Sequence, residues 1–138
     1  VAVVCGILSG TLASLGGIFA LCTLFGFNHQ QYVTMLPKSI TTAIGIGISE
    51  ELGGIVTITV AVIIITGILG NVIADTVFHI FKIKNPLAKG LALGTASHAI
   101  GTARAIEMGP VEGAMSSLAV AVAGLLTVIF VSGFAQLI

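Results

Sequence analysis

Three stretches of 23 to 26 residues carry no charged side chain, and they limit the possible folds more than any other feature of the chain. They cover residues 1–25, 52–74 and 113–138. About 20 apolar residues in a helix are enough to cross a bilayer. Only 7% of all residues are charged, whereas a soluble domain has roughly 25%. The sequence therefore predicts an all-α, polytopic integral membrane protein with a single transmembrane domain over 1–138.

Two further apolar stretches, 39–49 and 90–103, are too short to cross. Each follows a proline, Pro37 or Pro86, and each is interrupted by glycines. Apolar stretches of about 10–14 residues are more often re-entrant or buried than spanning; a broken helix that crosses completely is the alternative. The expected elements are long helices near 1–25, 54–81 and 111–136, and shorter helices or re-entrant pieces near 37–48 and 86–104, broken at 45–54 and 101–110.

The two short stretches repeat each other 56 residues apart. Residues 39–54 read SITTAIGIGISEELGG, and residues 95–110 read TASHAIGTARAIEMGP. The matched positions include two glycine pairs and the pair Glu51/Glu107, in a chain with only five acidic residues. Gly/Pro-interrupted segments in corresponding halves are the best sequence pointer to a transporter's substrate site. The sequence predicts repeat 1 over 37–81 and repeat 2 over 86–138.

The basic residues predict the orientation. Lys82, Lys84 and Lys89 cluster in one connector, which the positive-inside tendency places in the cytoplasm. The loop 26–36 has no Lys or Arg and is expected outside. The two short segments then enter the membrane from opposite sides, so the repeat is predicted to be inverted, the arrangement expected for alternating access.

The polar residues of the repeated segments favour a small anion as ligand. Helices that begin after the glycine breaks present free N–H groups and a partial positive charge. Arg104 is permanently charged and can hold a carboxylate in a bidentate pair, while Lys38 lies at the outer mouth of the first segment. The groups that can donate to a hydroxyl or carboxylate belong to Thr41, Thr42, Ser97, His98 and Thr102.

The two repeat-related glutamates are candidate coupling groups, because charges inside a membrane segment are by default a functional hypothesis. Glu107 lies three residues after Arg104 and is predicted to be its ion-pair partner. Glu51 is then predicted to carry a proton in coupled transport. Two alternatives stay open: a purely structural Arg104–Glu107 pair, and a core His98 that bonds a backbone carbonyl instead of a ligand.

The remaining polar residues have simpler interpretations. Asp75 is expected near the cytoplasmic interface, and Glu112 is expected to be a first-turn carboxylate favoured by the helix dipole. His29, Tyr32 and the lysine cluster are interpreted as headgroup-level anchors. The spacings Gly6-x-x-x-Gly10 and Gly90-x-x-x-Gly94 permit close helix packing, although such glycines also occur on lipid-facing surfaces.

No motif in the chain indicates an enzyme. The metalloprotease, nucleophile-elbow and phosphate-loop signatures are absent. Cys5 and Cys22 are about 25 Å apart if both lie on one helix, too far for a disulfide, and no Cys/His spacing fits a metal. Neither a cofactor nor a metal is expected, and a net charge of zero gives no reason to expect nucleic acid as a partner.

At LPKSITTAIGIGISEELGG (36–54) and LALGTASHAIGTARAIEMG (91–109) the chain closely resembles the LrgB/CidB family of holin-like and antiholin-like membrane proteins. Relatives in plants include the chloroplast glycolate/glycerate translocator. The resemblance covers essentially all of the chain and places it in the C-terminal portion of longer proteins. The matching motif positions are Lys38, Ser39, Thr41, Glu50 and Glu51 in the first segment, and Ser97, His98, Gly101, Thr102, Arg104 and Glu107 in the second.

The resemblance implies a multi-pass protein of the bacterial inner (plasma) membrane, or of the plastid inner envelope for a plant relative. It also implies an LrgA/CidA-type membrane partner, a homo-oligomer, and a link to murein hydrolase regulation and cytolysis. The leading hypothesis is a secondary carrier for small monocarboxylates such as glycolate, glycerate, pyruvate or lactate. The alternative is an antiholin-like regulatory subunit of a holin-type complex that transports nothing itself.

Overall fold

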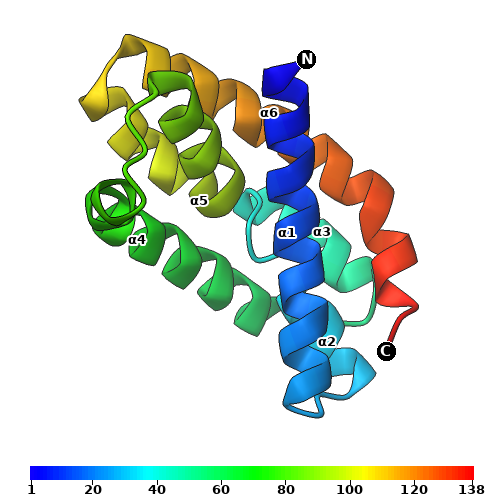
Figure 1. Ribbon diagram of the computed structural model, residues 1–138. Coiled ribbons are helices and arrows are strands. Elements are labelled where there is room, and N and C mark those ends of the chain that lie inside the picture. Colours follow the sequence, from blue (N-terminus) through cyan, green and yellow to red (C-terminus); the bar gives the residue numbers. More distant parts are fainter.

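The structure is a computed structural model that describes all 138 residues. It consists of six α-helices and contains no β-strand (Figure 1), so the predicted all-α class is confirmed. Three of the helices, α1, α4 and α6, are long and apolar enough to cross a membrane. The helices are α1 (Ala2–Leu24), α2 (His29–Met35), α3 (Thr42–Glu51), α4 (Val56–Ile80), α5 (Pro86–Met108) and α6 (Pro110–Ala135).

Local sequence explains where several helices begin. Asn28 starts α2 with a capping box, in which its side chain accepts from the Gln31 N–H at 2.9 Å and the Gln31 side chain accepts from the Asn28 N–H at 3.0 Å. Asn85 caps α5, whose first turn contains Pro86. Pro110 opens α6 in the same way, because a proline in the first turn removes an N–H that has no helical partner there.

The first break is shorter than the sequence predicts. α3 remains helical through Gly45, and only residues 52–55 separate it from α4. Gly53 lies in this break with φ of +75°, a conformation that glycine adopts without strain. Gly45 has a packing role instead, since an added Cβ would overlap Ile63 Cδ1. The prediction of a break over 45–54 is therefore wrong in its first half.

The second break lies at His98 and not at Gly101. His98 has φ of 45° and ψ of −135°, so α5 is two helical stretches that meet at this residue. Gly101 is helical, and an added Cβ would lie 2.6 Å from Ser97 Cβ. Glycine is thus needed here because the chain folds tightly around the break. α5 then continues to Met108, and the extended Gly109 separates it from α6, as the sequence predicts.

The two short helical stretches are each joined by hydroxyl groups to the long helix that follows. Ser49 of α3 and Thr59 of α4 place their side-chain oxygens 2.8 Å apart. Thr102 of α5 and Ser116 of α6 do the same, also at 2.8 Å. Each half of the chain therefore has a short helix, a break and a long helix, and the inverted relation between the halves stays a prediction.

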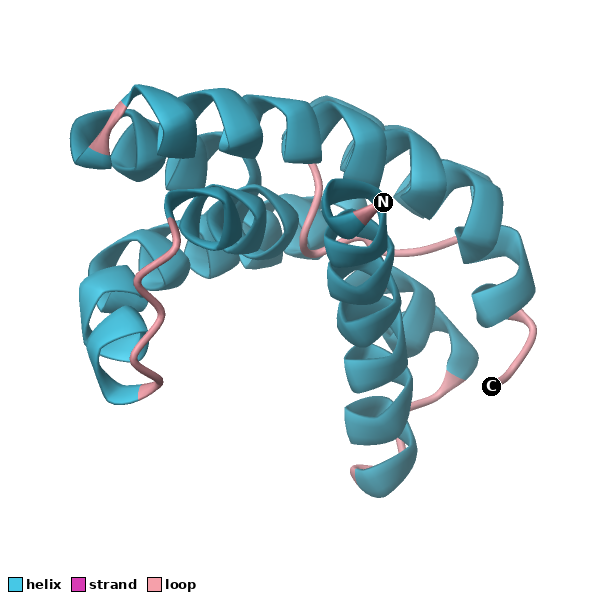
Figure 2. Ribbon diagram, turned by 45° about the horizontal axis from the view of Figure 1, so that its top comes forward, coloured by secondary structure: helices cyan, strands magenta, loops and turns pink.

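Close packing of α5 against α6 forms the most extensive helix pair in the molecule. Cβ atoms added at Gly90 and Gly94 would lie 2.8 Å from Met115 Cβ and 2.5 Å from Ser116 O, so only glycine allows this approach. α1 crosses α6, and α5 lies between α1 and α4 (Figures 1 and 2). This arrangement places the first stretch of α5 opposite the small residues of α1.

The largest apolar cluster joins the C-terminal part of α1 to α2 and to the end of α6. Tyr32 is completely buried in it, and its hydroxyl donates to Phe134 O at 2.8 Å. The ring of Tyr32 therefore fills the core between helices and is not exposed to headgroups on the surface of this chain. His29 is exposed, with Nδ1 2.9 Å from Ile138 O.

Candidate functional site

A groove of about 760 Å³ lies between α1 and the first stretch of α5. Its volume falls within the range of ligand pockets, roughly 300–1,000 Å³. The connector between α2 and α3 contributes Lys38 and Ser39 to its wall. The other hydroxyl groups on the wall come from Ser9 and Ser14 of α1 and Thr95 of α5. The groove is thus largely apolar, with its polar groups supplied by three separate elements.

Lys38 supplies the only positive charge in the groove. Its Nζ donates to Ser39 Oγ at 2.7 Å and lies 3.4 Å from Ser14 Oγ. No carboxylate lies within 4 Å of it, since both ion pairs of the chain involve Arg104. Burial lowers the pKa of Lys38 from its ordinary value, because removal from water disfavours the charged form. A half-buried ammonium held only by hydroxyl groups retains the capacity to bind an anion.

Small residues on α1 let α5 approach closely beside this site. A Cβ added at Gly10 would lie 2.6 Å from Thr95 Oγ1, and one added at Gly6 would lie 3.1 Å from Leu91 Cδ1. The Gly6-x-x-x-Gly10 pair therefore packs against α5 and does not face lipid. This close approach brings Thr95 to the same wall as Lys38.

The groove continues into a small polar cavity behind its wall. Ser14, Ser39 and Thr95 line both the groove and this cavity, which has a volume of about 10 Å³. A space of about this size is just large enough for one water molecule. The hydroxyl of Thr127 also borders it and donates to Ala123 O of its own helix at 2.7 Å, which leaves its oxygen lone pairs free to accept.

The break in α5 is packed against glycines of α4. His98 is 3% exposed, and its Nε2 lies 3.0 Å from Ile63 O. A Cβ added at Gly67 would lie 2.8 Å from His98 Cε1, and one added at Gly70 would lie 2.8 Å from Ser97 Cβ. The imidazole therefore bonds a backbone carbonyl, as in the core-histidine alternative.

Side chains donate to backbone carbonyls at and just after this break. The Asn71 amide donates to Ile100 O at 3.2 Å, and Thr102 Oγ1 donates to His98 O at 2.9 Å. No buried side-chain nitrogen or oxygen in the chain lacks a hydrogen-bond partner. Side chains of α4 and α5 thus add hydrogen bonds around the break, where an irregular backbone within a membrane needs partners from the protein.

Arg104 lies at the protein surface and is neutralised by two carboxylates. It pairs with Glu107 at 2.7 Å and with Asp75 of α4. The predicted Arg104–Glu107 ion pair is therefore present. Asp75 is not part of the predicted pair, because it precedes Arg104 by 29 positions and its sequence context indicates a separate interfacial group. Arg104 lines neither the groove nor the small cavity.

The other predicted site residues are distributed over several places. Thr41 is the N-cap of α3 without a side-chain cap bond, and Thr42 begins that helix; both are partly buried. Glu51 is exposed at the far end of α3 and has no ion-pair partner. The structure therefore joins Lys38 to Ser39, and Arg104 to Glu107, and makes no hydrogen bond between Arg104 and Thr41, Thr42 or Glu51.

Three hydroxyl residues of the groove, Ser9, Ser14 and Thr95, are not among the predicted site residues. Ser14 lies in an uncharged apolar helix, where a serine usually bonds its own backbone. Its signal is the stripe of small residues that it shares with Gly6, Gly10 and Ala13, which marks the helix face that approaches a neighbour. Thr95 is the first residue of the second repeated segment, and its own signal is that position alone.

Comparison with known proteins places this site in a defined family. A model described as "LrgB-like family" matches residues 1–137. The protein named "Antiholin-like protein LrgB" of Bacillus subtilis (strain 168) is 39% identical over 136 residues, which are 99% of this chain and 59% of that protein. The protein of the same name from Bacillus cereus (strain B4264) is 41% identical over 128 residues, 93% of this chain and 56% of that protein. The chain thus spans somewhat over half the length of these relatives, and no solved structure matches it.

Proposed function

The chain belongs to the LrgB-like family, and on that premise we propose that it forms part of a membrane carrier for small monocarboxylates of the glycolate, glycerate, pyruvate and lactate class. The substrate carboxylate binds Lys38 in the groove between α1 and α5. The groove hydroxyls of Ser14, Ser39 and Thr95 bind the remaining oxygens of a hydroxy or keto acid. Three long apolar helices support the membrane location.

The observation that carries this proposal is the ammonium of Lys38 without a carboxylate partner. A charged group that is partly removed from water is unfavourable unless it is paired. A bound carboxylate would supply the missing charge, and hydrogen bonds to charged groups contribute about 1.5–3 kcal/mol each. The first turn of α3 begins four residues after Lys38, and a helix N-terminus carries a partial positive charge that also favours an anion.

Movement of the substrate across the membrane requires access from both sides. The breaks at 52–55 and at His98 provide places where the two halves can change their relative position, and we propose that the halves form the predicted inverted repeat. Glu51 is proposed as the proton carrier, since Glu107 is engaged by Arg104. Glu51→Gln should then abolish uptake driven by a pH gradient and preserve substrate exchange.

A second candidate function is regulation of lysis without transport. The name "Antiholin-like protein LrgB" of the relatives favours it. In this case the chain acts as a non-transporting subunit that controls murein hydrolase activity through contacts with an LrgA/CidA-type protein in the cell membrane. We propose no catalytic reaction for either function. The two functions are compatible, because export of acidic metabolites would itself influence lysis.

Uptake into vesicles tests the carrier proposal. The full-length protein is reconstituted with and without its LrgA/CidA-type partner, and labelled glycolate, lactate and pyruvate are supplied with empty vesicles as control. We expect saturable uptake of at least one of them, accelerated when the vesicles are preloaded with the same unlabelled acid. Uptake equal to that of empty vesicles in both preparations would contradict transport and favour the regulatory subunit.

A further inference from the structure

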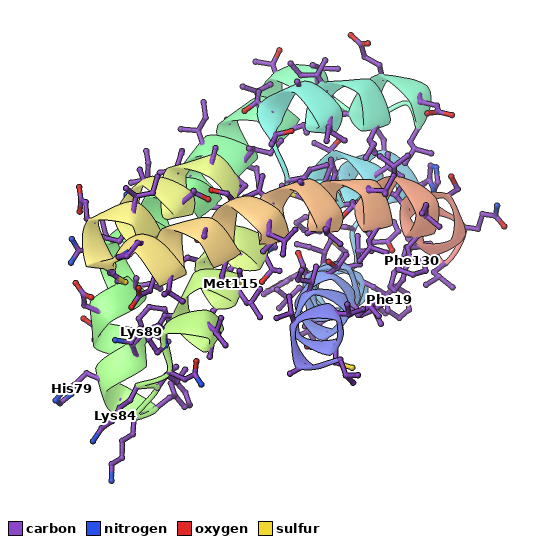
Figure 3. The ribbon with its side chains drawn as sticks, turned by 90° about the horizontal axis from the view of Figure 1, so that it is seen from above. Phe19, His79, Lys84, Lys89, Met115 and Phe130 are labelled. Atoms are coloured by element: carbon purple, nitrogen blue, oxygen red, sulfur yellow. The ribbon has the colours of Figure 1, made fainter.

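A second recess, of about 570 Å³, lies at the end of α4, outside the groove of Lys38. It is formed by the last turns of α4, the connector 81–85 and the start of α5. Figure 3 shows three of its side chains, His79, Lys84 and Lys89, gathered at one end of the molecule. The charged and titratable side chains that line it are Asp75, His79, Lys82, Lys84 and Lys89.

The positive charge of this recess is not compensated within the chain. Asp75 is its only carboxylate and is engaged by Arg104. No carboxylate lies within 4 Å of any of the three lysines, because both ion pairs of the chain involve Arg104. Lys89 is half-buried, with Nζ 5.8 Å from the centroid of the Phe78 ring. The recess therefore holds three cationic side chains that lack an anion.

An ordered turn holds these lysines in place. The Ile83 N–H donates to Phe78 O at 2.8 Å, and the Lys82 N–H donates to His79 O at 3.2 Å. Lys82 has φ of 54°, in the left-handed region that is unfavourable for a residue with a side chain. Together with the two hydrogen bonds, this residue forms the Schellman motif that commonly ends an α-helix. The connector is thus a defined part of the recess.

Exposed apolar residues border the basic recess. Ile80 ends α4 and Phe81 begins the connector, and they are 65% and 71% exposed; Val72 is 72% exposed on α4. A free phosphate would have no use for this apolar surface. A lipid would use both parts, because its headgroup and its acyl chains meet at this depth of a bilayer. The positive-inside tendency places the same end of α4 at the cytoplasmic leaflet, which carries anionic lipids.

We propose that this recess binds the phosphodiester headgroup of an anionic phospholipid, with Lys89 as its innermost contact and Lys82 and Lys84 at its rim. The acyl chains lie along the exposed face of α4. The lipid supplies the anion that Asp75 cannot supply, and it anchors the connector between the two halves of the chain. This site is independent of the groove at Lys38.

Purified full-length protein in a mild non-ionic detergent allows a direct test, since membrane orientation does not matter there. Binding of dioctanoyl phosphatidylglycerol is measured by native mass spectrometry and by the shift of the unfolding temperature. Dioctanoyl phosphatidylcholine tests the need for net charge, and glycerol 3-phosphate tests the need for acyl chains. We expect saturable binding of phosphatidylglycerol that weakens with added salt, and at least about tenfold weaker binding of the other two.

Three variants locate the site. Lys89→Gln and Lys82→Gly should each weaken binding about fivefold, the expected effect of one lysine near an anionic headgroup. Lys82→Gly is chosen because glycine accepts the local φ, so the variant should fold at least as well as the parent chain. Lys38→Gln removes the same charge outside the recess and should leave lipid binding unchanged.

Several outcomes would overturn the proposal. Equal binding of phosphatidylcholine would show that no anionic headgroup is recognised, and equal binding of glycerol 3-phosphate would indicate a free-phosphate site in place of a lipid site. If Lys82→Gly and Lys89→Gln both bind phosphatidylglycerol as tightly as the parent chain, the lipid binds elsewhere.

Discussion

Lys38 and Arg104 show two opposite ways of keeping a cation in a membrane protein with few charges. Arg104 is at the surface, and Asp75 and Glu107 both pair with it. Lys38 is half-buried in a groove and contacts only the hydroxyls of Ser14 and Ser39. The first cation is neutralised within the fold and connects α4 to α5. The second is left for an anion that comes from outside, and this difference is what separates a structural ion pair from a candidate binding site.

The largest expected effect follows from the unpaired cation. Lys38→Gln should reduce carboxylate uptake by about two orders of magnitude, because the loss of one member of a buried charged pair costs about 2–5 kcal/mol. Initial rates of labelled glycolate, lactate and pyruvate uptake in vesicles measure this effect. Ser117→Ala is a suitable control, since the Ser117 hydroxyl only donates to Gly113 O of its own helix. Uptake at the parental rate by Lys38→Gln would remove Lys38 from the site.

The next largest effect should be a loss of stability when a substitution disturbs the packing between α4 and the break in α5. Gly70→Ala would force a Cβ to within 2.8 Å of Ser97 Cβ, and overpacking of this kind typically costs about 1–3 kcal/mol. Gly133→Ala is the matched control, because nothing lies within 4 Å of its Cβ and alanine favours a helix. Unfolding in detergent should show Gly70→Ala destabilised and Gly133→Ala unchanged or stabilised. Equal stability of the two variants would contradict the close contact.

A smaller effect on uptake is expected from the hydroxyl beside Lys38. Ser39→Ala removes the 2.7 Å contact of the ammonium, and a hydrogen bond to a charged group contributes about 1.5–3 kcal/mol at most. The substrate can replace part of this contact, so we expect KM to rise by about tenfold while the maximal rate stays within about twofold. An unchanged KM would show that Ser39 holds Lys38 without contacting the substrate.

Much of the fold could be predicted because its signals are local. Uncharged stretches predict α1, α4 and α6, and Asn85 with Pro86 predicts the start of α5. The break at His98 could not be predicted, since it depends on Gly67 and Gly70 of α4 making room for it. Glycine in these segments served both turns and close packing, and the sequence alone does not distinguish the two.

The candidate site could be predicted only in part, because only some of its residues are neighbours in the sequence. Lys38 and Ser39 are adjacent in the sequence and belong to a matching motif, so the sequence indicates them. Ser14 comes to Lys38 only through the crossing of α1, 24 positions away. Asp75 reaches Arg104 across 29 positions. Contacts of this range require the packing of helices, which hydropathy and spacing do not specify.

Substitutions of Arg104, the paired cation, should have the smallest effects on uptake and stability. These effects decide whether the contrast with Lys38 is correct. Arg104→Lys keeps the charge and loses the planar fork that reaches Asp75 and Glu107 together. Since exposed ion pairs contribute little, we expect a smaller loss of stability than for Gly70→Ala, and uptake within about twofold of the parent chain.

Asp75→Asn should give the same small change. The double variant Arg104→Lys with Asp75→Asn should lose no further stability, because both substitutions remove the same contact between Arg104 and Asp75. Uptake rates and unfolding in detergent measure both quantities. If Arg104→Lys loses most of its uptake while Asp75→Asn keeps it, the guanidinium binds the substrate as the repeated segments predict, and the distinction between the two cations fails.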